Sequence, residues 1–502
     1  MENIFDLITA ADSRATAILA PDMKPLTYGD LVSTIDRLAG QLRALGIARG
    51  DRVAIVLPNG PQMAITYLAV ASCSTAAPLN PKYREKEFKF YMDDLGAKAL
   101  ITLEGDAEEA HAAARDGTLR ISSDGDPRAL NFRHEGTVPN PAQPDFADAD
   151  DEALVLHTSG TTSRPKIVPL KQRNIMASAG NIVASLALTC EDRCLNVMPL
   201  FHIHGLMAGL LSPLASGGSV ACTPGFDAFK FFDWLAELDP TWYTAVPTMH
   251  QVVLSRARRY GDVIERSRLR FIRSSSASMP KVVIEDIQRV FGVPLIEAYG
   301  MTEATHQMAS NPLAPGEQKP GSVGMGTGIE IATMNDAGDL LSEGDEGEVV
   351  IRGRTVITGY ENNPDANAKA FTNGWFRTGD QGRLDEDGYL FLTGRLKEII
   401  NRGGEKISPL EVDEVLLRHP AVAQAVTFGM PHDKLGEEVA AAVVLAEGAS
   451  ITEGEVRDYA AEHLTDFKVP RKIVFLNEIP KGPTGKMQRI GLAERLGLAK
   501  TV

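Results

Sequence analysis

The amino-acid sequence predicts an α/β protein with a large N-terminal domain of layered sheets and helices, a small β-rich subdomain and a small α+β C-terminal domain. At 502 residues the chain is too long for a single hydrophobic core. Short β-rich runs alternate with helical patterns through most of the chain before Gly394. The pattern changes near Gly347, and it changes again after Gly394.

Alternating strands and helices define the N-terminal part. Strands are predicted where short apolar, β-branched runs are bounded by turn residues, at 53–57, 99–102, 153–156 and 295–298. Helices are predicted where apolar residues recur at helical spacing, at 31–45, 61–72, 229–238 and 281–291. The acidic, glycine-containing stretch 123–151 is predicted to be a surface loop.

Two smaller units follow. Residues 347–394 contain GEVVIRG, GWFRTGD and GYLFLTGR, which predict short strands joined by tight glycine turns. A helix is predicted at 409–418 within a compact α+β pattern. We therefore place the domain boundary between an N-terminal domain, 1–394, and a C-terminal domain, 395–502.

Charge and hydropathy argue against several classes of protein. The net charge is −15, which argues against a nucleic-acid partner. No apolar run reaches the ~20 residues that a transmembrane helix needs, and the first residues lack the basic start of a secretory signal. Four cysteines in the whole chain indicate a reducing compartment, so we expect a cytoplasmic protein. The sequence does not indicate an oligomeric state.

A zinc site at Cys190, Cys194, His202 and His204 is disfavoured. The cysteine spacing is at the loose end for structural zinc, and the histidine spacing is tighter than usual.

The segment TSGTTSRPK, residues 158–166, predicts a phosphate-binding loop. It lies between two apolar runs, is rich in hydroxyl side chains and ends on a cation. Such a loop offers backbone N–H groups, hydroxyl donors and the Lys166 ammonium to phosphate oxygens. It is not a Walker loop, because no G-x-x-x-x-G-K-[ST] pattern is present. The segment therefore indicates a nucleoside triphosphate substrate.

Further segments carry chemically specific residues. EAYGMTE (297–303) places two carboxylates, an aromatic ring and a hydroxyl at the end of a strand, which is where α/β sheets bind ligands. A carboxylate near triphosphate oxygens indicates a bound Mg²⁺. TGD (378–380) suits a ribose diol. GRLKEIINRGGEKISP (394–409) is rich in cations, and PKGPTGK (480–486) delivers one lysine.

Together and in this order, these segments resemble the adenylate-forming enzymes, which include acyl-CoA synthetases, luciferases and peptide-synthetase adenylation domains. The resemblance covers essentially the whole chain. Within the family the chain is most similar to the oxalate–CoA ligases, in PLFHIHGLMAGLLSPL, TWYTAVPTMHQ, RSSSASMP and EAYGMTEATHQMASNPL. The resemblance implies an ATP- and Mg²⁺-dependent acid–CoA ligase, with ATP, CoA and a carboxylic acid as small-molecule partners.

The family motifs imply roles for individual residues. The nucleotide should be bound by Thr158, Ser159, Gly160, Thr161, Thr162, Lys166, Ser276, Ala277, Ser278, Glu297, Ala298, Tyr299, Gly300, Asp380 and Arg395. Among these, Tyr299 should stack on the adenine, and Asp380 and Arg395 should bind the ribose. Catalysis is assigned to Lys486, Thr302, Glu303 and His204, with Glu303 holding Mg²⁺.

The C-terminal domain is implied to move. Lys397 matches the hinge about which this domain rotates between the two half-reactions, so that Lys486 leaves before CoA enters. Gly404 should let the CoA arm pass close to the backbone, and Lys406 is a further cofactor-binding residue.

The acid is predicted to be a small dicarboxylate such as oxalate. The expected acid site contains His202, His204, Ser276, His306 and Asn311, which can hydrogen-bond a second carboxylate, and a histidine beside it can take up a proton. A buried carboxylate without partners is costly, so this polar site favours a dicarboxylate over an alkyl chain.

Other readings stay open. A medium- or long-chain fatty acid–CoA ligase would need an apolar tunnel, a carrier-loading enzyme would use a protein thiol instead of CoA, and a nucleotide-binding pseudo-ligase would not catalyse. The phosphate loop also departs from the family pattern, with Ser163 and Ile167 at positions where glycine is usual. Ile167 is expected to start the next strand early.

Overall fold

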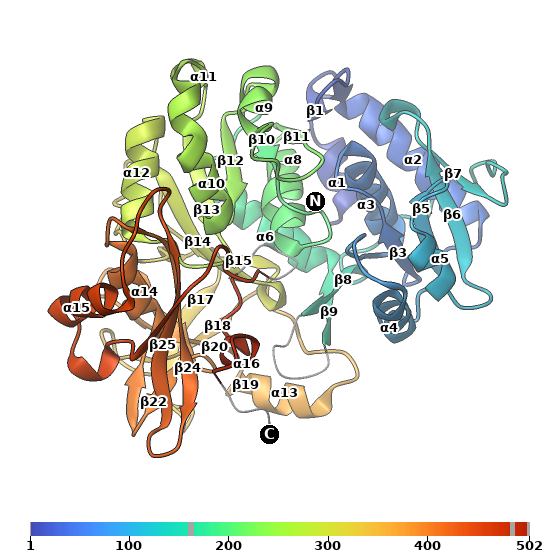
Figure 1. Ribbon diagram of the computed structural model, residues 1–502. Helices are drawn as coiled ribbons and strands as arrows, with labels where there is room; N and C mark the ends of the chain where they lie inside the picture. The colour runs from blue at the N-terminus through green and yellow to red at the C-terminus, as the bar shows by residue number, and fades with distance from the viewer. Residues whose placement is uncertain (1, 159–164, 482–486, 499–502) are drawn as a thin grey trace.

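The computed structural model describes residues 2–158, 165–481 and 487–498. Four sheets with packed helices make up this part of the chain (Figure 1). Every strand and helix predicted above is present, with its ends within three residues of the expected positions. No helix in the described ranges has the length and apolarity to cross a membrane.

A seven-stranded sheet is built from the first third of the chain. Its strands are mostly parallel, with antiparallel strands at both edges. In spatial order they are β7 (Asn131–His134), β6 (Leu119–Asp124), β5 (Ala99–Leu103), β3 (Arg52–Val56), β4 (Thr75–Pro78), β8 (Glu152–Thr158) and β9 (Lys166–Lys171).

A nine-stranded sheet forms the second large layer. Its six central strands run parallel, so their carboxyl ends meet at one edge. The order is β16 (Met325–Gly326), β15 (His306–Ser310), β14 (Leu295–Met301), β13 (Phe271–Ser275), β12 (Trp242–Ala245), β10 (Arg193–Asn196), β11 (Ser219–Cys222), β1 (Thr16–Leu19) and β2 (Leu26–Thr27).

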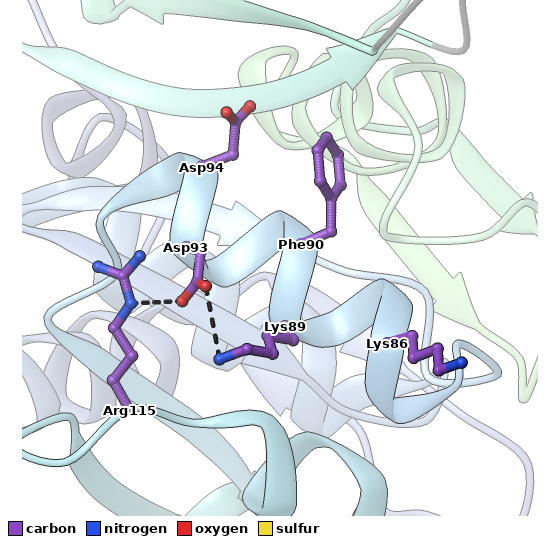
Figure 2. Close-up of a pocket in the computed structure, with 6 residues that line it drawn as sticks. All are labelled: Lys86, Lys89, Phe90, Asp93, Asp94 and Arg115. Atoms are coloured by element: carbon purple, nitrogen blue, oxygen red, sulfur yellow. Dashed lines mark ion pairs between the residues drawn. The ribbon is translucent and has the colours of Figure 1, made fainter.

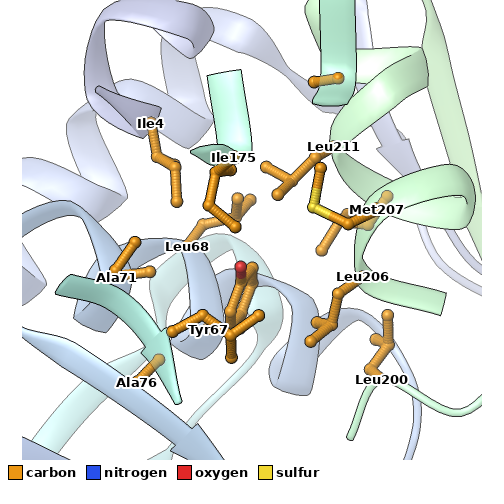
Figure 3. Close-up of a cluster of buried hydrophobic side chains, with 14 of the residues drawn as sticks. Ile4, Tyr67, Leu68, Ala71, Ala76, Ile175, Leu200, Leu206, Met207 and Leu211 are labelled. Carbon is orange, nitrogen blue, oxygen red and sulfur yellow. The ribbon is translucent and has the colours of Figure 1, made fainter. Parts of the chain in front are cut away.

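A shared layer of helices packs between the two large sheets. Apolar side chains from both sheets and from these helices form one core, part of which is shown in Figure 3. Tyr67 and Leu68 lie at its centre with all of their surface buried. The layer consists of α1 (Ile4–Thr9), α2 (Tyr28–Ala44), α3 (Pro61–Cys73), α6 (Gln172–Ser185), α7 (Ile203–Leu206), the π-helical turn η2 (Met207–Leu211) and α8 (Ser212–Ala215).

Helices also cover the outer face of each large sheet, which gives five layers. The seven-stranded sheet is covered by α4 (Glu85–Leu95) and α5 (Glu108–Ala113). The nine-stranded sheet is covered by α9 (Phe231–Leu238), α10 (Pro247–Ala257), α11 (Gly261–Arg266) and α12 (Lys281–Phe291). Each helix buries one apolar stripe against its sheet and exposes the opposite side.

The predicted β-rich subdomain is a five-stranded sheet. Antiparallel pairing joins β17 (Glu330–Met334), β18 (Gly347–Arg352), β20 (Trp375–Leu384), β19 (Phe371–Thr372) and β21 (Leu390–Arg395). Helix α13 (Pro364–Ala370) precedes β19, and the short turn η4 (Thr302–Ala304) links β14 to β15.

The C-terminal part is a second five-stranded sheet with helices on both faces. Its strands are β22 (Ile400–Arg402), β23 (Glu405–Ile407), β24 (Val422–His432), β25 (Gly436–Leu445) and β26 (Lys472–Phe475). One face packs on α14 (Pro409–Leu417) and α15 (Glu453–His463), and the other on α16 (Leu492–Arg495).

The prediction of a surface loop at 123–151 is wrong in part. The segment contains a 3₁₀ turn, η1 (Pro127–Ala129), and the edge strand β7. Leu130 and Phe132 are fully buried there, against the core that α2 shares. Two apolar residues in an otherwise polar stretch are enough to anchor an edge strand, and their pattern is too short to read from the sequence.

Candidate functional site

Several predicted site residues come together at the carboxyl edge of the nine-stranded sheet. His204 follows β10, Ser276 follows β13 and Glu303 follows β14. Thr244, near the end of β12, lies between them. Parallel pairing brings these segments to one edge although nearly a hundred residues separate His204 from Glu303.

The phosphate loop is flanked as predicted. Strand β8 ends at Thr158, β9 begins at Lys166, and these two residues are paired across the antiparallel ladder. Strand β9 begins one residue before Ile167, at Lys166, and Ile167 is its buried second residue. Ser159, Gly160, Thr161, Thr162 and Ser163 lie outside the described residues.

Lys166 belongs to a compact charged cluster with Glu303. Its ammonium lies 4.1 Å from the ring centre of Tyr360, and the Tyr360 hydroxyl donates to Glu303 Oε1 at 2.8 Å. Burial lowers the pKa of Lys166, Glu303 opposes this shift, and Lys397 adds to it. The predicted hinge lysine, Lys397, therefore lies close enough to Lys166 to affect its charge.

The residues around Glu303 fit a magnesium ion held together with phosphates. The carboxylate is buried, and its Oε1 atom is oriented by Tyr360. Mg²⁺ is usually held by one or two carboxylates together with substrate phosphates and water. No group of three or more metal-ligating side chains gathers within the described ranges.

Tyr299, Asp380 and Arg395 form a second cluster. The Tyr299 hydroxyl donates to Asp380 Oδ2, and Arg395 Nε lies 2.8 Å from Asp380 Oδ1. Burial, and next the Asp380 charge, raises the pKa of Tyr299 well above its usual value. Strands β20 and β21 place Asp380 directly opposite Arg395, so this pair is built into the sheet register.

Other residues assigned to the nucleotide line the same region. Ser276 has a positive φ of 78°, and Ala277 and Ser278 after it are exposed. Glu297 and Ala298 are buried within β14, and burial raises the pKa of Glu297 to about 8. The Glu297 carboxyl is therefore largely protonated at neutral pH.

The residues predicted for the acid site include a buried polar network around two histidines. His204 Nδ1 lies 3.1 Å from Ser276 Oγ, and His204 Nε2 lies 2.6 Å from Thr244 Oγ1. The His306 ring stacks on His204 with 4.9 Å between ring centres. Arg273 Nη2 reaches His306 Nε2 at 3.2 Å. Both histidines are buried, at 0% and 1% exposure.

Two residues predicted for the acid site are engaged elsewhere by their described contacts. His202 caps α7, where its Nδ1 accepts from the His204 backbone N–H at 3.3 Å. The Asn311 amide donates to the Ser322 carbonyl at 2.7 Å and accepts from the Lys319 N–H at 3.3 Å. Their predicted contact with the acid stays a prediction.

The residues assigned to the CoA side lie on the C-terminal sheet. Gly404 lies between β22 and β23 with φ of 100°, a backbone conformation that favours glycine. Lys397 and Lys406 are exposed. Lys486 lies outside the described residues, but Arg489, three residues later, has a largely buried side chain.

Arg489 joins the end of the chain to the hinge segment. Its guanidinium contacts Glu398 at 3.1 Å and Asp413 at 2.7 Å, and it donates to the Thr427 carbonyl at 2.7 Å. Glu398 is next to Lys397 in the chain. Thus one buried cation ties the segment that carries Lys486 to the segment that carries the predicted hinge.

Sequence analysis missed Arg273, Thr244 and Tyr360. Arg273 opens a segment that was singled out by resemblance, RSSSASMP, but a charged residue inside a strand gives no local signal of its partners. Tyr360 follows the small-subdomain strand β18 and reaches Glu303 only through folding. Their hydrogen bonds join residues that are 29 to 57 positions apart in the sequence. A short sequence motif cannot predict contacts over such separations.

An open surface pocket of about 530 Å³ lies apart from these clusters (Figure 2). It is lined by one face of α4 and by Arg115, which pairs with Asp93. Asp94 on the same helix contacts His157 Nε2 at 3.0 Å, immediately before the phosphate loop. None of the residues predicted for ATP, acid or CoA lines this pocket.

Family models match almost the whole chain. The AMP-binding enzyme family matches residues 8–361, and the AMP-binding enzyme C-terminal domain matches residues 411–486. The first matched range includes the predicted phosphate loop, Glu303 and Tyr360, whereas Asp380 and Arg395 lie between the two matched ranges.

Individual proteins are similar over nearly their full length. An oxalate–CoA ligase of Arabidopsis thaliana is 46% identical over 92% of this chain and 92% of its own. An oxalate–CoA ligase of Saccharomyces cerevisiae is 39% identical over 97% and 96%. The ATP-bound structure of MatB from Rhodopseudomonas palustris superposes with a TM-score of 0.90, at 29% identity over 98% of both chains.

Replacing Gly300 by alanine should destabilise the site. A Cβ atom there would lie 1.9 Å from the His306 carbonyl oxygen, so β14 or β15 must shift. Gly300→Ala should cost roughly 1–3 kcal/mol of unfolding free energy in a urea titration. Gly261→Ala is the control, since nothing lies within 4 Å of its added Cβ. Equal unfolding midpoints for the two variants would contradict the prediction.

Removing the Arg489 charge should loosen the C-terminal sheet. Arg489→Met leaves Asp413 buried without its cation, which costs about 3–5 kcal/mol when a buried pair is broken. Hydrogen exchange of peptides that cover α14 and β24 measures this loss. Arg471→Met removes an exposed pair with Asp466 and should cost less than about 1 kcal/mol. Unchanged protection in Arg489→Met would show that the pair contributes little.

Proposed function

Because the chain belongs to the AMP-binding enzyme family, we propose that it is an AMP-forming acid–CoA ligase whose acid is oxalate. The reaction converts oxalate, ATP and CoA to oxalyl-CoA, AMP and diphosphate. The observation that carries the choice of acid is the buried polar network of His204, Ser276, His306 and Arg273. The similarity to two proteins named oxalate–CoA ligase supports it.

In the first step an oxalate carboxylate oxygen attacks the α-phosphorus of ATP, and diphosphate leaves. Both reactants are anions, so cations must offset their repulsion and the charge that develops. Lys166, Thr158 and the loop between them bind the phosphates, Thr302 contacts the α-phosphate, and Lys486 contacts the attacking carboxylate. Mg²⁺ held by Glu303, when bound, neutralises charge on the phosphate oxygens.

The nucleoside is bound by the second cluster. Tyr299 forms one wall of the adenine site, and the Asp380–Arg395 pair meets the ribose hydroxyls. The Asp380 carboxylate is held by Tyr299 and Arg395 in a fixed orientation, which supports a preorganised ribose contact.

In the second step the CoA thiol sulfur attacks the acyl carbon of the adenylate, and AMP leaves. We place the domain boundary between 394 and 395, with Lys397 as the hinge that carries Lys486 away. Gly404 and Lys406 then face the CoA arm. The four cysteines are free, which fits a reducing compartment such as the cytoplasm.

A fatty acid–CoA ligase is the weaker candidate. The described end of the acid site is filled by Arg273, His204, Thr244 and Gln307, which hydrogen-bond one another. An alkyl chain would bury these polar groups without partners of its own.

Diphosphate release over a panel of acids, with and without CoA, tests the proposed function. Oxalate should give CoA-dependent turnover, and Lys486→Ala should lose the adenylation step by at least about 100-fold, as expected for a group that contacts the transition state. Turnover of a fatty acid without turnover of oxalate would keep the family and refute the acid. ATP binding without diphosphate release would indicate a pseudo-ligase.

Glu303→Gln should raise the Mg²⁺ concentration needed for half-maximal adenylation by roughly tenfold, since an amide oxygen is a weaker ligand than a carboxylate. Titration of Mg²⁺ at saturating ATP and oxalate measures this shift. Glu330→Gln, at an exposed carboxylate paired with Arg352, is the control and should leave the midpoint unchanged. Equal midpoints for the two variants would remove Glu303 from the metal site.

A further inference from the structure

A buried arginine lies behind the predicted acid site, and no carboxylate among the described residues pairs with it. Arg273, in the middle of β13, has 0% of its surface exposed. Burial lowers its pKa to about 9, so it remains protonated at neutral pH. Within the described residues its hydrogen-bond partners are all neutral groups, and its Nε atom has none.

The lack of a counter-ion is unusual for so deeply buried a cation. A charge in the interior is costly unless it is paired. By contrast, Arg489 in the C-terminal part, whose side chain is 13% exposed, has two carboxylates within 3.1 Å. Thr244 Oγ1 and Gln307 Oε1 accept from Arg273 at 3.1 and 2.9 Å, but neither carries a charge. An anionic group of the bound substrate would compensate the positive charge of Arg273.

The same guanidinium sets the protonation of both histidines. Arginine N–H groups can only donate. Arg273 Nη1 lies 3.3 Å from His204 Nε2, and Nη2 lies 3.2 Å from His306 Nε2. Both Nε2 atoms must therefore accept, which places the single proton of each neutral imidazole on Nδ1. With this tautomer the Thr244 hydroxyl, which accepts from Arg273, donates to His204 Nε2.

The fixed tautomer determines how Ser276 meets the acid. His204 Nδ1–H donates to Ser276 Oγ at 3.1 Å. The Ser276 hydroxyl proton can then be donated onward to a carboxylate oxygen. Hydrogen bonds in such a chain polarise one another, so the charge on Arg273 strengthens the donor at Ser276.

We propose that Arg273 is a positioning residue that fixes His204 and His306 as Nδ1–H donors and makes the site select an acid with a second anionic group. The inference rests on the proposed function, because it assigns the second carboxylate of the acid to this network. The positive charge expected from a protonated histidine is supplied by Arg273 instead. The two histidines act as neutral donors between that charge and the acid.

Oxalate and oxamate distinguish charge selection from shape, because oxamate replaces one carboxylate by an amide of similar size. Arg273→Met should lower kcat/KM for oxalate about 30- to 100-fold, mainly by raising KM, as expected for a lost charge-assisted interaction. For oxamate the loss should stay below about tenfold. Equal losses for the two acids would show that Arg273 is only structural.

Two further variants test the origin of the effect. Arg273→Lys keeps the charge but cannot hold both Nε2 atoms, so it should retain more of the oxalate preference than Arg273→Met while kcat falls. An equal loss of preference in both variants would overturn the proposal. Arg193→Met is the matched control, since Arg193 starts β10 in the same sheet and donates to neutral groups, Ser219 and the Leu238 carbonyl. It should leave the oxalate-to-oxamate ratio unchanged.

A spectroscopic measurement on the wild-type protein does not depend on whether the Arg273 variants fold. Nitrogen-15 spectra of the histidine rings, assigned with His204→Gln and His306→Gln, should show both rings neutral with the proton on Nδ1. A proton on Nε2 of either ring would overturn the proposal. If the wild-type protein turns over neither acid, the proposed function is wrong, and the tautomers still decide whether Arg273 holds the histidines.

Discussion

The shared helical layer between the two large sheets is the constraint on which the site depends. Helices α1, α2, α3, α6 and α8 pack against both sheets, and their apolar side chains form one continuous core. Burial at about 25 cal/mol per Å² of apolar surface makes this layer hard to shift. The β8–β9 hairpin of one sheet and the carboxyl edge of the other are therefore held at a fixed separation. A triphosphate and an acid can only be aligned on such a rigid frame.

Within this frame the site brings together charges that would repel or remain unpaired elsewhere. Lys397 lowers the pKa of Lys166, and the Glu303 carboxylate raises it. Asp380 is paired with Arg395 and bonded by Tyr299. Arg273 is the exception, because its described partners are neutral. These cations lie where the proposed anionic substrates bind. The free-energy cost of desolvating them is met when the chain folds and not when the substrates bind.

Single side chains add polar links to the apolar packing of the site, which includes residues of the small sheet. Tyr360 links the small sheet to Glu303, and Arg489 links the end of the chain to Glu398 beside the hinge lysine. Tyr360 and Glu303 both lie before residue 394, and Glu398 and Arg489 both lie after it. Each link therefore holds side chains in place within one of the two proposed domains.

The sequence by itself determined the layers, the predicted strands and helices, and the set of motifs that belongs to one enzyme family. The spacing of apolar residues along a segment predicts which of its sides is buried. A motif such as 297–303 can be recognised from the order of its residues alone. It did not determine that Leu130 and Phe132 anchor an edge strand, that Asn311 and His202 bond to backbone, or that Arg273 joins two histidines. These depend on which strands become neighbours in the sheet. Parallel pairing of β12, β13 and β14 places side chains together that no spacing along the chain connects, so only the tertiary structure decided them.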